Sequence, residues 1–389
     1  MRKTTTLLFG SLLSLGVAQQ SPFVQRSYIP VPSAPVQNDP FWITARSFTT
    51  VGGNDGDGEY TRHAHDPNGD YYLQSLDLGL NLQPTDWFAG FFNLTTFQGA
   101  EGLDSEWEEG FVKFIAPDDT GLELRAGRYR NRLGRTNALC VDGWDYVDAN
   151  LSLTHFFGDE GLYTEGAEIS WRKDFEKGFF HVSNSYGQVV AHAHHHDEHE
   201  GHDEHEDEGG FEDELFTSRA LLQYNITDFH QNTLGLNYAK AVGGGDLSMY
   251  GADYEYQWRE NGLENGGRSV SVVGEYLGLD DGEEVRDSLA FSTMYDFGNG
   301  FSIGGRYEWI EFEAHHEEEE EEPGHDDEEE HELGDRKRFS AVLTYRRPFL
   351  DNWMGQARAQ YNYDQLDSGE SRQGAWFQLG FYYGSPEIR

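Results

Sequence analysis

Histidine is concentrated in three stretches of this 389-residue chain, and its imidazole is the group there that can do chemistry. Thirteen of the sixteen histidines fall in these stretches, interleaved with aspartate and glutamate. They are His63, His65, His192, His194, His195, His196, His199, His202, His205, His315, His316, His325 and His331. Neutral imidazole binds zinc, copper and nickel, and carboxylates can complete the coordination shell. The stretches therefore predict capture of transition-metal ions, most simply zinc.

The negative charge of the chain, which is −42 at pH 7, is concentrated in two of the same stretches. Eleven acidic residues and no Lys or Arg lie between Ala191 and Leu215, and fourteen lie between Glu313 and Asp335, again without Lys or Arg. These carboxylates raise the local concentration of cations. Calcium or magnesium would need only the carboxylates, so the histidines favour a softer metal. A solvated, repulsive surface loop, in which His merely dilutes the acid, stays open as an alternative.

A second charged group is basic. Five arginines lie within eleven residues, and three aspartates follow. They are Arg125, Arg128, Arg130, Arg132, Arg135, Asp142, Asp145 and Asp148. Such side chains can line a pore and select ions, or the arginines can pair with the aspartates and pin a loop to a wall. Both interpretations remain open from the sequence, and one arginine can do both.

The elements that must position these groups show a period of two. In the last stretch of the chain, Phe377, Leu379 and Phe381 fall on one face, opposite Gln378 and Gly380. Runs of this kind, about ten residues long, suit tilted strands that cross a bilayer. Sixteen are recognisable, at 42–50, 71–83, 87–97, 107–116, 121–129, 163–172, 178–189, 216–225, 232–241, 247–257, 268–277, 287–296, 301–312, 337–346, 354–364 and 373–383. We predict a single all-β domain, a closed antiparallel transmembrane barrel of about sixteen strands.

The domain organisation follows from the start of the chain. Met1-Arg2-Lys3 precedes a short apolar run, which is typical of a secretory signal peptide, here residues 1–18. Residues 19–40 are rich in proline and read as a periplasmic leader, and residues 41–389 form the barrel. The mean hydropathy is −0.71, and after the signal no apolar run is long enough for a membrane helix. The predicted location is the bacterial outer membrane.

The lengths of the connections predict which side of the membrane each one faces. If the chain starts in the periplasm, connections after odd strands are long and external, and those after even strands are short. The segments 51–70, 130–162, 190–215 and 313–336 are the long ones. The predicted order of strands places all of them outside the cell, so the histidines lie near the mouth of the barrel.

One part of the chain resembles a known family. The run from Ala126 to Gly134, the following Gly143-Trp144-Asp145-Tyr146-Val147-Asp148 and then Glu165 to Glu168 resemble the phosphate-selective porins. The resemblance covers about residues 120–175. It implies a trimeric, sixteen-stranded outer-membrane channel whose third loop folds inward and whose arginines line the pore.

Three functions are consistent with these features. The first is a passive porin whose His-rich external loops capture zinc or a similar ion near the pore mouth. The second is an anion-selective or general diffusion porin with incidental acidic loops, and the third is a non-conducting surface metal-binding protein or adhesin. Expected partners are outer-membrane lipids and metal ions or small solutes. The resemblance implies a homotrimer with two further copies of the chain, and nucleic acid is not expected.

An enzyme is not predicted. His155 and His181 lie outside the histidine-rich stretches, but no nucleophile motif accompanies either of them. Cys140 is the single cysteine, which excludes an intramolecular disulfide and a Cys-rich metal site. No cofactor is required, because any metal would be bound or transported as a ligand.

Overall fold

The computed structural model describes residues 40–55, 69–99, 102–117, 120–139, 141–157, 161–190, 211, 214–243, 247–262, 266–282, 284–313, 333–350, 353–384 and 387–388. The predicted signal peptide and all of the predicted leader except Pro40 lie outside these residues. No helix in the described ranges is long and apolar enough to cross a membrane.

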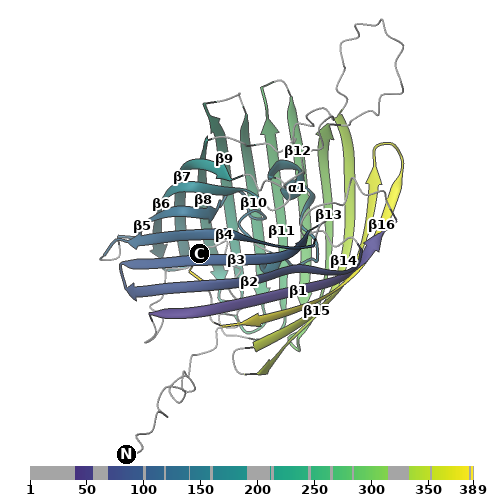
Figure 1. The fold of residues 1–389 in the computed structure, drawn as a ribbon, viewed down its shortest axis with the longest axis horizontal. Helices are drawn as coiled ribbons and strands as arrows, with labels where there is room; N and C mark the ends of the chain where they lie inside the picture. The colour runs from purple at the N-terminus through teal and green to yellow at the C-terminus, as the bar shows by residue number, and fades with distance from the viewer. Residues whose placement is uncertain are drawn as a thin grey trace, which may run out of the picture.

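The described residues form a closed antiparallel barrel, which confirms the predicted fold class (Figure 1). Each strand pairs with its sequence neighbours, and β1 closes the ring by pairing with β16, with Ala45 opposite Tyr383. The strands are β1 (Phe41–Asn54), β2 (Gly69–Thr85), β3 (Phe88–Gly99), β4 (Gly102–Ile115), β5 (Leu122–Arg130), β6 (Tyr163–Phe175), β7 (Gly178–Val190), β8 (Glu214–Thr227), β9 (His230–Val242), β10 (Ser248–Arg259), β11 (Ser269–Asp280), β12 (Val285–Asp296), β13 (Phe301–Glu313), β14 (Leu333–Leu350), β15 (Trp353–Leu366) and β16 (Ser371–Tyr383).

The two faces of the strands differ as the period of two requires. On β2, Leu78 and Leu80 are 42% and 40% exposed on the outside, whereas Ser75, Asp77 and Asn81 point inward and are buried. The same alternation runs through β13, β14 and β16. An apolar outer face with a polar inner face is the arrangement of barrels that span the bacterial outer membrane. The protein is therefore an outer-membrane barrel, and the closed ring of paired strands leaves no open sheet edge toward the lipid.

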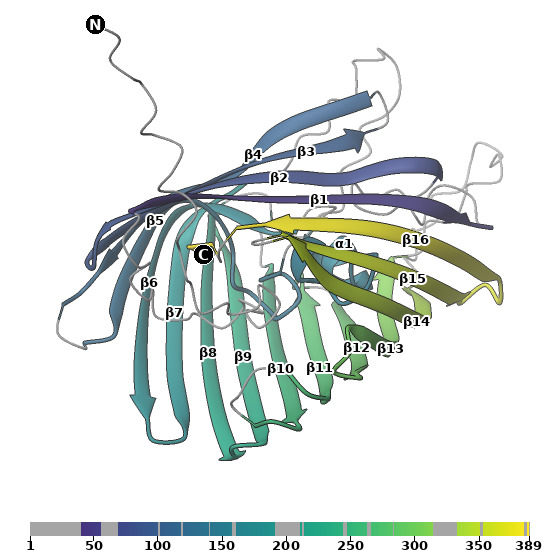
Figure 2. The ribbon, with the colours of Figure 1, turned by 90° about the horizontal axis from the view of Figure 1, so that it is seen from below.

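Most connections follow the predicted pattern of lengths, although only two residues join β3 to β4 and nine join β10 to β11. Those after the even strands β2, β6, β8 and β14 each contain only two residues between the strand ends. The long connections follow β1, β5, β7 and β13. The connection after β5 is the one long connection whose residues are mostly described, and it contains the 3-10 turn η2 (Val141–Gly143) and the helix α1 (Leu151–Phe157). Figure 2 shows α1 inside the ring of strands.

Candidate pore constriction

Two asparagines near the start of the loop between β5 and β6, residues 131–162, fasten its two ends together. Asn131 is buried and donates from Nδ2 to Thr164 Oγ1 at 3.0 Å, while its Oδ1 accepts from the Leu133 backbone N–H at 3.0 Å. Asn137 donates to the Asn131 carbonyl at 2.8 Å and accepts from the Leu162 N–H at 2.7 Å. These bonds join the two ends of the loop, as the amide side chain can do because it both donates and accepts.

The loop carries its own apolar core into the lumen. Leu133, Trp144, Leu153 and Phe156 are buried together, and inward-facing Ile310 of β13 packs in the same cluster. Asn150 precedes α1, whose first backbone N–H, that of Leu151, donates to Glu308 Oε1 of β13 at 2.9 Å. Burial of several large apolar side chains is the main term that keeps such a segment folded. The helix was not predicted, but the inward course of the loop was, and it is confirmed.

Arginines on the inward face of strands between β8 and β15 hold the loop. Arg219 of β8 donates to the Arg132 carbonyl at 3.0 Å and pairs with Asp253 of β10 at 2.9 Å. Arg358 of β15 donates to the Tyr146 carbonyl at 3.0 Å and also to the Trp144 carbonyl. Both guanidinium groups are at most 3% exposed, and each satisfies backbone carbonyls that a buried loop would otherwise leave unpaired.

Asp148 has four side-chain partners on the wall. It pairs with Arg306 of β13 at 2.7 Å and with Arg338 of β14 at 2.9 Å, and it accepts from Gln360 and Asn362 of β15, each at 2.6 Å. Although burial alone would raise the pKa of this carboxyl, the two guanidinium groups hold it below its ordinary value of 3.8. Asp148 is therefore an anchor held in its charged form.

Glu275 of β11 is a second carboxylate that holds the loop. It accepts from the backbone N–H of Thr136 at 3.2 Å and from the Thr136 hydroxyl. Gly134 makes room for it: its φ is +73°, and a Cβ there would lie 2.7 Å from Glu275 Oε1. Only glycine adopts this left-handed conformation without strain, so Gly134 lets the chain turn against the wall.

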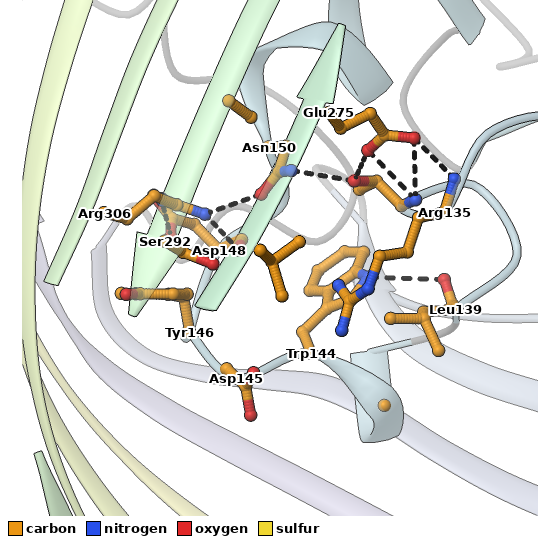
Figure 3. A pocket seen from close by; sticks show the side chains of 14 residues that line it. Arg135, Leu139, Trp144, Asp145, Tyr146, Asp148, Asn150, Glu275, Ser292 and Arg306 are labelled. Atoms are coloured by element: carbon orange, nitrogen blue, oxygen red, sulfur yellow. Dashed lines mark hydrogen bonds and ion pairs between the residues drawn. The ribbon is translucent and has the colours of Figure 1, made fainter. Parts of the chain in front are cut away.

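A cavity of the lumen lies between the loop and the strands β11, β12 and β13. It is lined by Arg135, Trp144, Asp145, Tyr146, Glu275 and Arg306, among others. Figure 3 shows the side chains that line it, with the ring of Tyr146 and the carboxylate of Asp145 on the loop side. The Arg306 guanidinium stacks 4.4 Å from the centre of the Tyr146 ring, and burial raises the pKa of Tyr146. Charged and aromatic groups thus surround this cavity.

The predicted arginines are only partly brought together. Arg125 and Arg132 share Glu168 of β6, at 3.0 Å and 2.9 Å. Arg130 stacks 4.4 Å from the Tyr163 ring, and the Arg128 guanidinium lies 5.8 Å from it. The Arg135 guanidinium lies 3.7 Å from Glu255, and it is the one of the five that lines the cavity. Their contribution to ion selection stays a prediction.

The predicted partners of these arginines differ from the observed ones. Pinning was expected through pairs with the aspartates of the loop, but Asp148 pairs with Arg306 and Arg338 of the wall instead. Asp145 is half-buried at the cavity. Asp142 lies in η2, and its side chain is outside the described part of the structure.

Sequence reasoning missed the wall residues that hold the loop, namely Arg219, Arg338, Arg358, Glu275 and Glu308. One pattern could have pointed to them: a charged side chain on the inward face of a strand. Arg306 and Glu308 fit this pattern, because both alternate with outward-facing residues on β13. Their targets could not be read from the alternation, because they lie in a loop up to 214 residues away.

The thirteen candidate metal ligands all lie outside the described residues. Within the described ranges no group of three or more His, Cys, Asp or Glu side chains could hold a metal ion. Zinc capture by the His-rich stretches therefore stays a prediction. His155 and His181, which were considered for catalysis, lie on α1 and on β7.

Comparison with protein-family models and with curated protein sequences finds no match. Solved structures share the fold. An anion-selective porin from Comamonas acidovorans is 13% identical, with 88% of this chain and 98% of that chain covered and a TM-score of 0.52. OprB of Pseudomonas putida is 12% identical, with 88% and 94% covered and a TM-score of 0.54. OmpF of Salmonella typhi, in complex with daunomycin, is 11% identical, with 87% and 97% covered and a TM-score of 0.51.

Proposed function

We propose that this protein is a passive outer-membrane porin whose His-rich external loops capture zinc or a similar transition-metal ion near the pore mouth. The observation that carries the porin part is the loop 131–162, which is fastened inside the lumen and leaves a cavity lined by charged groups. Solved structures with the same fold include porins, which supports a channel. The composition of residues 190–215 and 313–336 carries the metal part.

A second candidate is an anion-selective or general diffusion porin, in which the acidic loops are incidental. Arg135 and Arg306 favour it, because both line the cavity where an anion would pass. The pairing of Arg306 with Asp148, at 2.7 Å, weakens its field at the cavity. The resemblance to the phosphate-selective porins supports the same candidate and a homotrimer.

The reversal potential of the purified barrel in a planar bilayer under a salt gradient tests the proposal, with and without micromolar zinc. We expect a cation-selective potential that zinc shifts, because the loops concentrate cations at one mouth. The matched variant replaces the histidines of 191–210 and 315–332 by glutamine and keeps every carboxylate. It should keep the cation selectivity and lose the response to zinc.

The other outcomes assign the function differently. An anion-selective potential that is indifferent to zinc would favour the second candidate. A folded barrel that passes no current but binds zinc through the same histidines would be a surface metal-binding protein rather than a porin.

A further inference from the structure

The chain turns back into the barrel after its last strand. Gly384 follows β16 with φ +95°, and a Cβ there would lie 2.6 Å from the Ile43 carbonyl oxygen of β1. This left-handed residue allows the sharp turn that an L side chain would oppose. Glu387 and Ile388 then lie against the inner face of β1 to β5, and Figure 2 shows this end of the chain inside the ring of strands.

The Glu387 carboxylate is held by the side chains of β1. Thr44 Oγ1 donates to Oε1 at 2.8 Å, and Arg46 Nη2 lies 3.0 Å from Oε2. The Glu387 side chain is 3% exposed. Gly79 of β2 leaves the space that this carboxylate fills, since a Cβ at Gly79 would lie 2.7 Å from Oε1. Both oxygens therefore have a cation or a donor within reach in a closed site.

Ile388 completes the contact on the apolar side. Its backbone N–H donates to Asn81 Oδ1 at 2.8 Å, and its side chain is 6% exposed. The residues that pack with it are Ala89, Phe91, Phe111, Tyr129 and Trp42. These side chains all belong to β1, β3, β4 and β5, and their cluster faces the lumen.

An apolar patch inside a porin-type lumen is unusual, because the inner face of such a barrel is polar and wet. Here the patch lies directly beside a site for a carboxylate. If Glu387 and Ile388 left, aromatic surface would meet water, and the buried Thr44 and Asn81 would lose the partners given above. The wall is thus shaped for a ligand that carries a carboxylate next to a branched aliphatic group.

We infer that the inner wall of β1 to β5 is a binding site for short aliphatic carboxylates, including acidic peptides, and that Glu387 and Ile388 occupy it as a tethered competitor. The tether gives these residues a high effective concentration at the site, so a free ligand binds only when they are displaced. In the pore proposed above, this site would hold such solutes on the side of the lumen opposite α1. The binding itself does not depend on conduction.

The test uses the full-length barrel in detergent and a fluorescein-labelled peptide, Ser-Pro-Glu-Ile-Arg, whose binding is followed by anisotropy. In the variant Glu387→Gln/Ile388→Asn the site should open, and the peptide should bind at least tenfold more tightly than to the unaltered chain. The control peptide Ser-Pro-Gln-Asn-Arg should not bind. Adding Gly79→Ala to the double variant should abolish binding, because the new methyl group fills the carboxylate site.

Far-UV circular dichroism and the heat-dependent shift in electrophoretic mobility verify that each variant is a folded barrel. Equal binding of the two peptides, or no binding to the folded double variant, would overturn the inference. A measurement of conductance separates the binding-site inference from the porin proposal. A barrel that binds the peptide but passes no current contradicts only the porin, whereas a conducting barrel that ignores the peptide contradicts only this site.

Discussion

The two sides of the lumen hold chain segments by different means. On the side of β8 to β15, buried guanidinium groups hold the loop 131–162. They form ion pairs with Asp148 and donate hydrogen bonds to backbone carbonyls of the loop. From β1 to β5, a single arginine, Arg46, and an apolar patch hold Glu387 and Ile388. Breaking a buried charge pair costs several kcal/mol. Asp148 of the loop makes two such pairs, whereas Glu387 makes one and Ile388 adds one buried aliphatic side chain. The loop is therefore fastened by more buried contacts than the end of the chain, which supports the displacement inferred for Glu387 and Ile388.

The largest expected effect comes from Asp148→Ala. The substitution leaves Arg306 and Arg338 buried without this carboxylate, and breaking a buried pair in this way destabilises by about 3–5 kcal/mol. We expect the loop to leave the wall and the single-channel conductance to rise, with a lower midpoint in thermal unfolding. Asp145→Ala is the matched control, because Asp145 lies three residues away at the cavity and is only half-buried. An unchanged conductance in Asp148→Ala would show that the other contacts are sufficient to hold the loop against the wall.

A smaller effect is expected from pH. The pKa of Asp148 is lowered in the folded protein, so its contribution to stability is complete above the unfolded value and is lost as pH falls through the folded value. In zinc-free buffer, conductance should therefore be constant from pH 8 to about 4 and should change only in stronger acid, since the ordinary value is 3.8. The response to zinc should disappear much earlier, near about pH 6.5, as the histidines protonate. If the conductance changed over the same pH range in which the response to zinc disappears, the two effects would not arise from Asp148 and the histidines separately.

The smallest effect is expected at the turn between β10 and β11. Arg268 bonds Glu260 at 2.6 Å and lowers its pKa to about 2, but the pair is exposed to solvent. Exposed ion pairs contribute little because water and salt screen them. Glu260→Gln should leave the thermal midpoint and the conductance unchanged within error. A shift as large as that of Asp148→Ala would mean that burial is not what separates the two pairs.

The sequence predicted the barrel because each strand shows its two faces locally. Leu78 and Asp77 differ in type where they differ in environment, and sixteen repeats of that alternation leave few other folds. The inward loop was also predicted, from the resemblance of about residues 120–175 to a known family. Its anchors were not, because which loop atom Arg338 or Arg358 reaches depends on how the loop folds over distant strands.

The second site was missed for a different reason. Glu387 and Ile388 are two ordinary residues after a strand, and no period or motif marks them. Their contacts with Thr44, Arg46 and Asn81 join positions more than 300 residues apart, which become neighbours only when β1 meets β16. Closure of the ring, rather than any local pattern, creates this site.

The long reach of the wall arginines also bears on the order in which the barrel assembles. Asp148 and its partner Arg338 are 190 residues apart, and Trp144 and Arg358 are 214 residues apart. Contacts between residues so far apart in sequence form late in folding, because closing a long stretch of chain costs conformational entropy before the contact can stabilise it. Until β14 and β15 have paired with the rest of the sheet, the loop lacks these anchors. The loop 131–162 can therefore take its final place in the lumen only after β13 to β15 have joined the sheet, which makes its attachment to the wall a late step of folding.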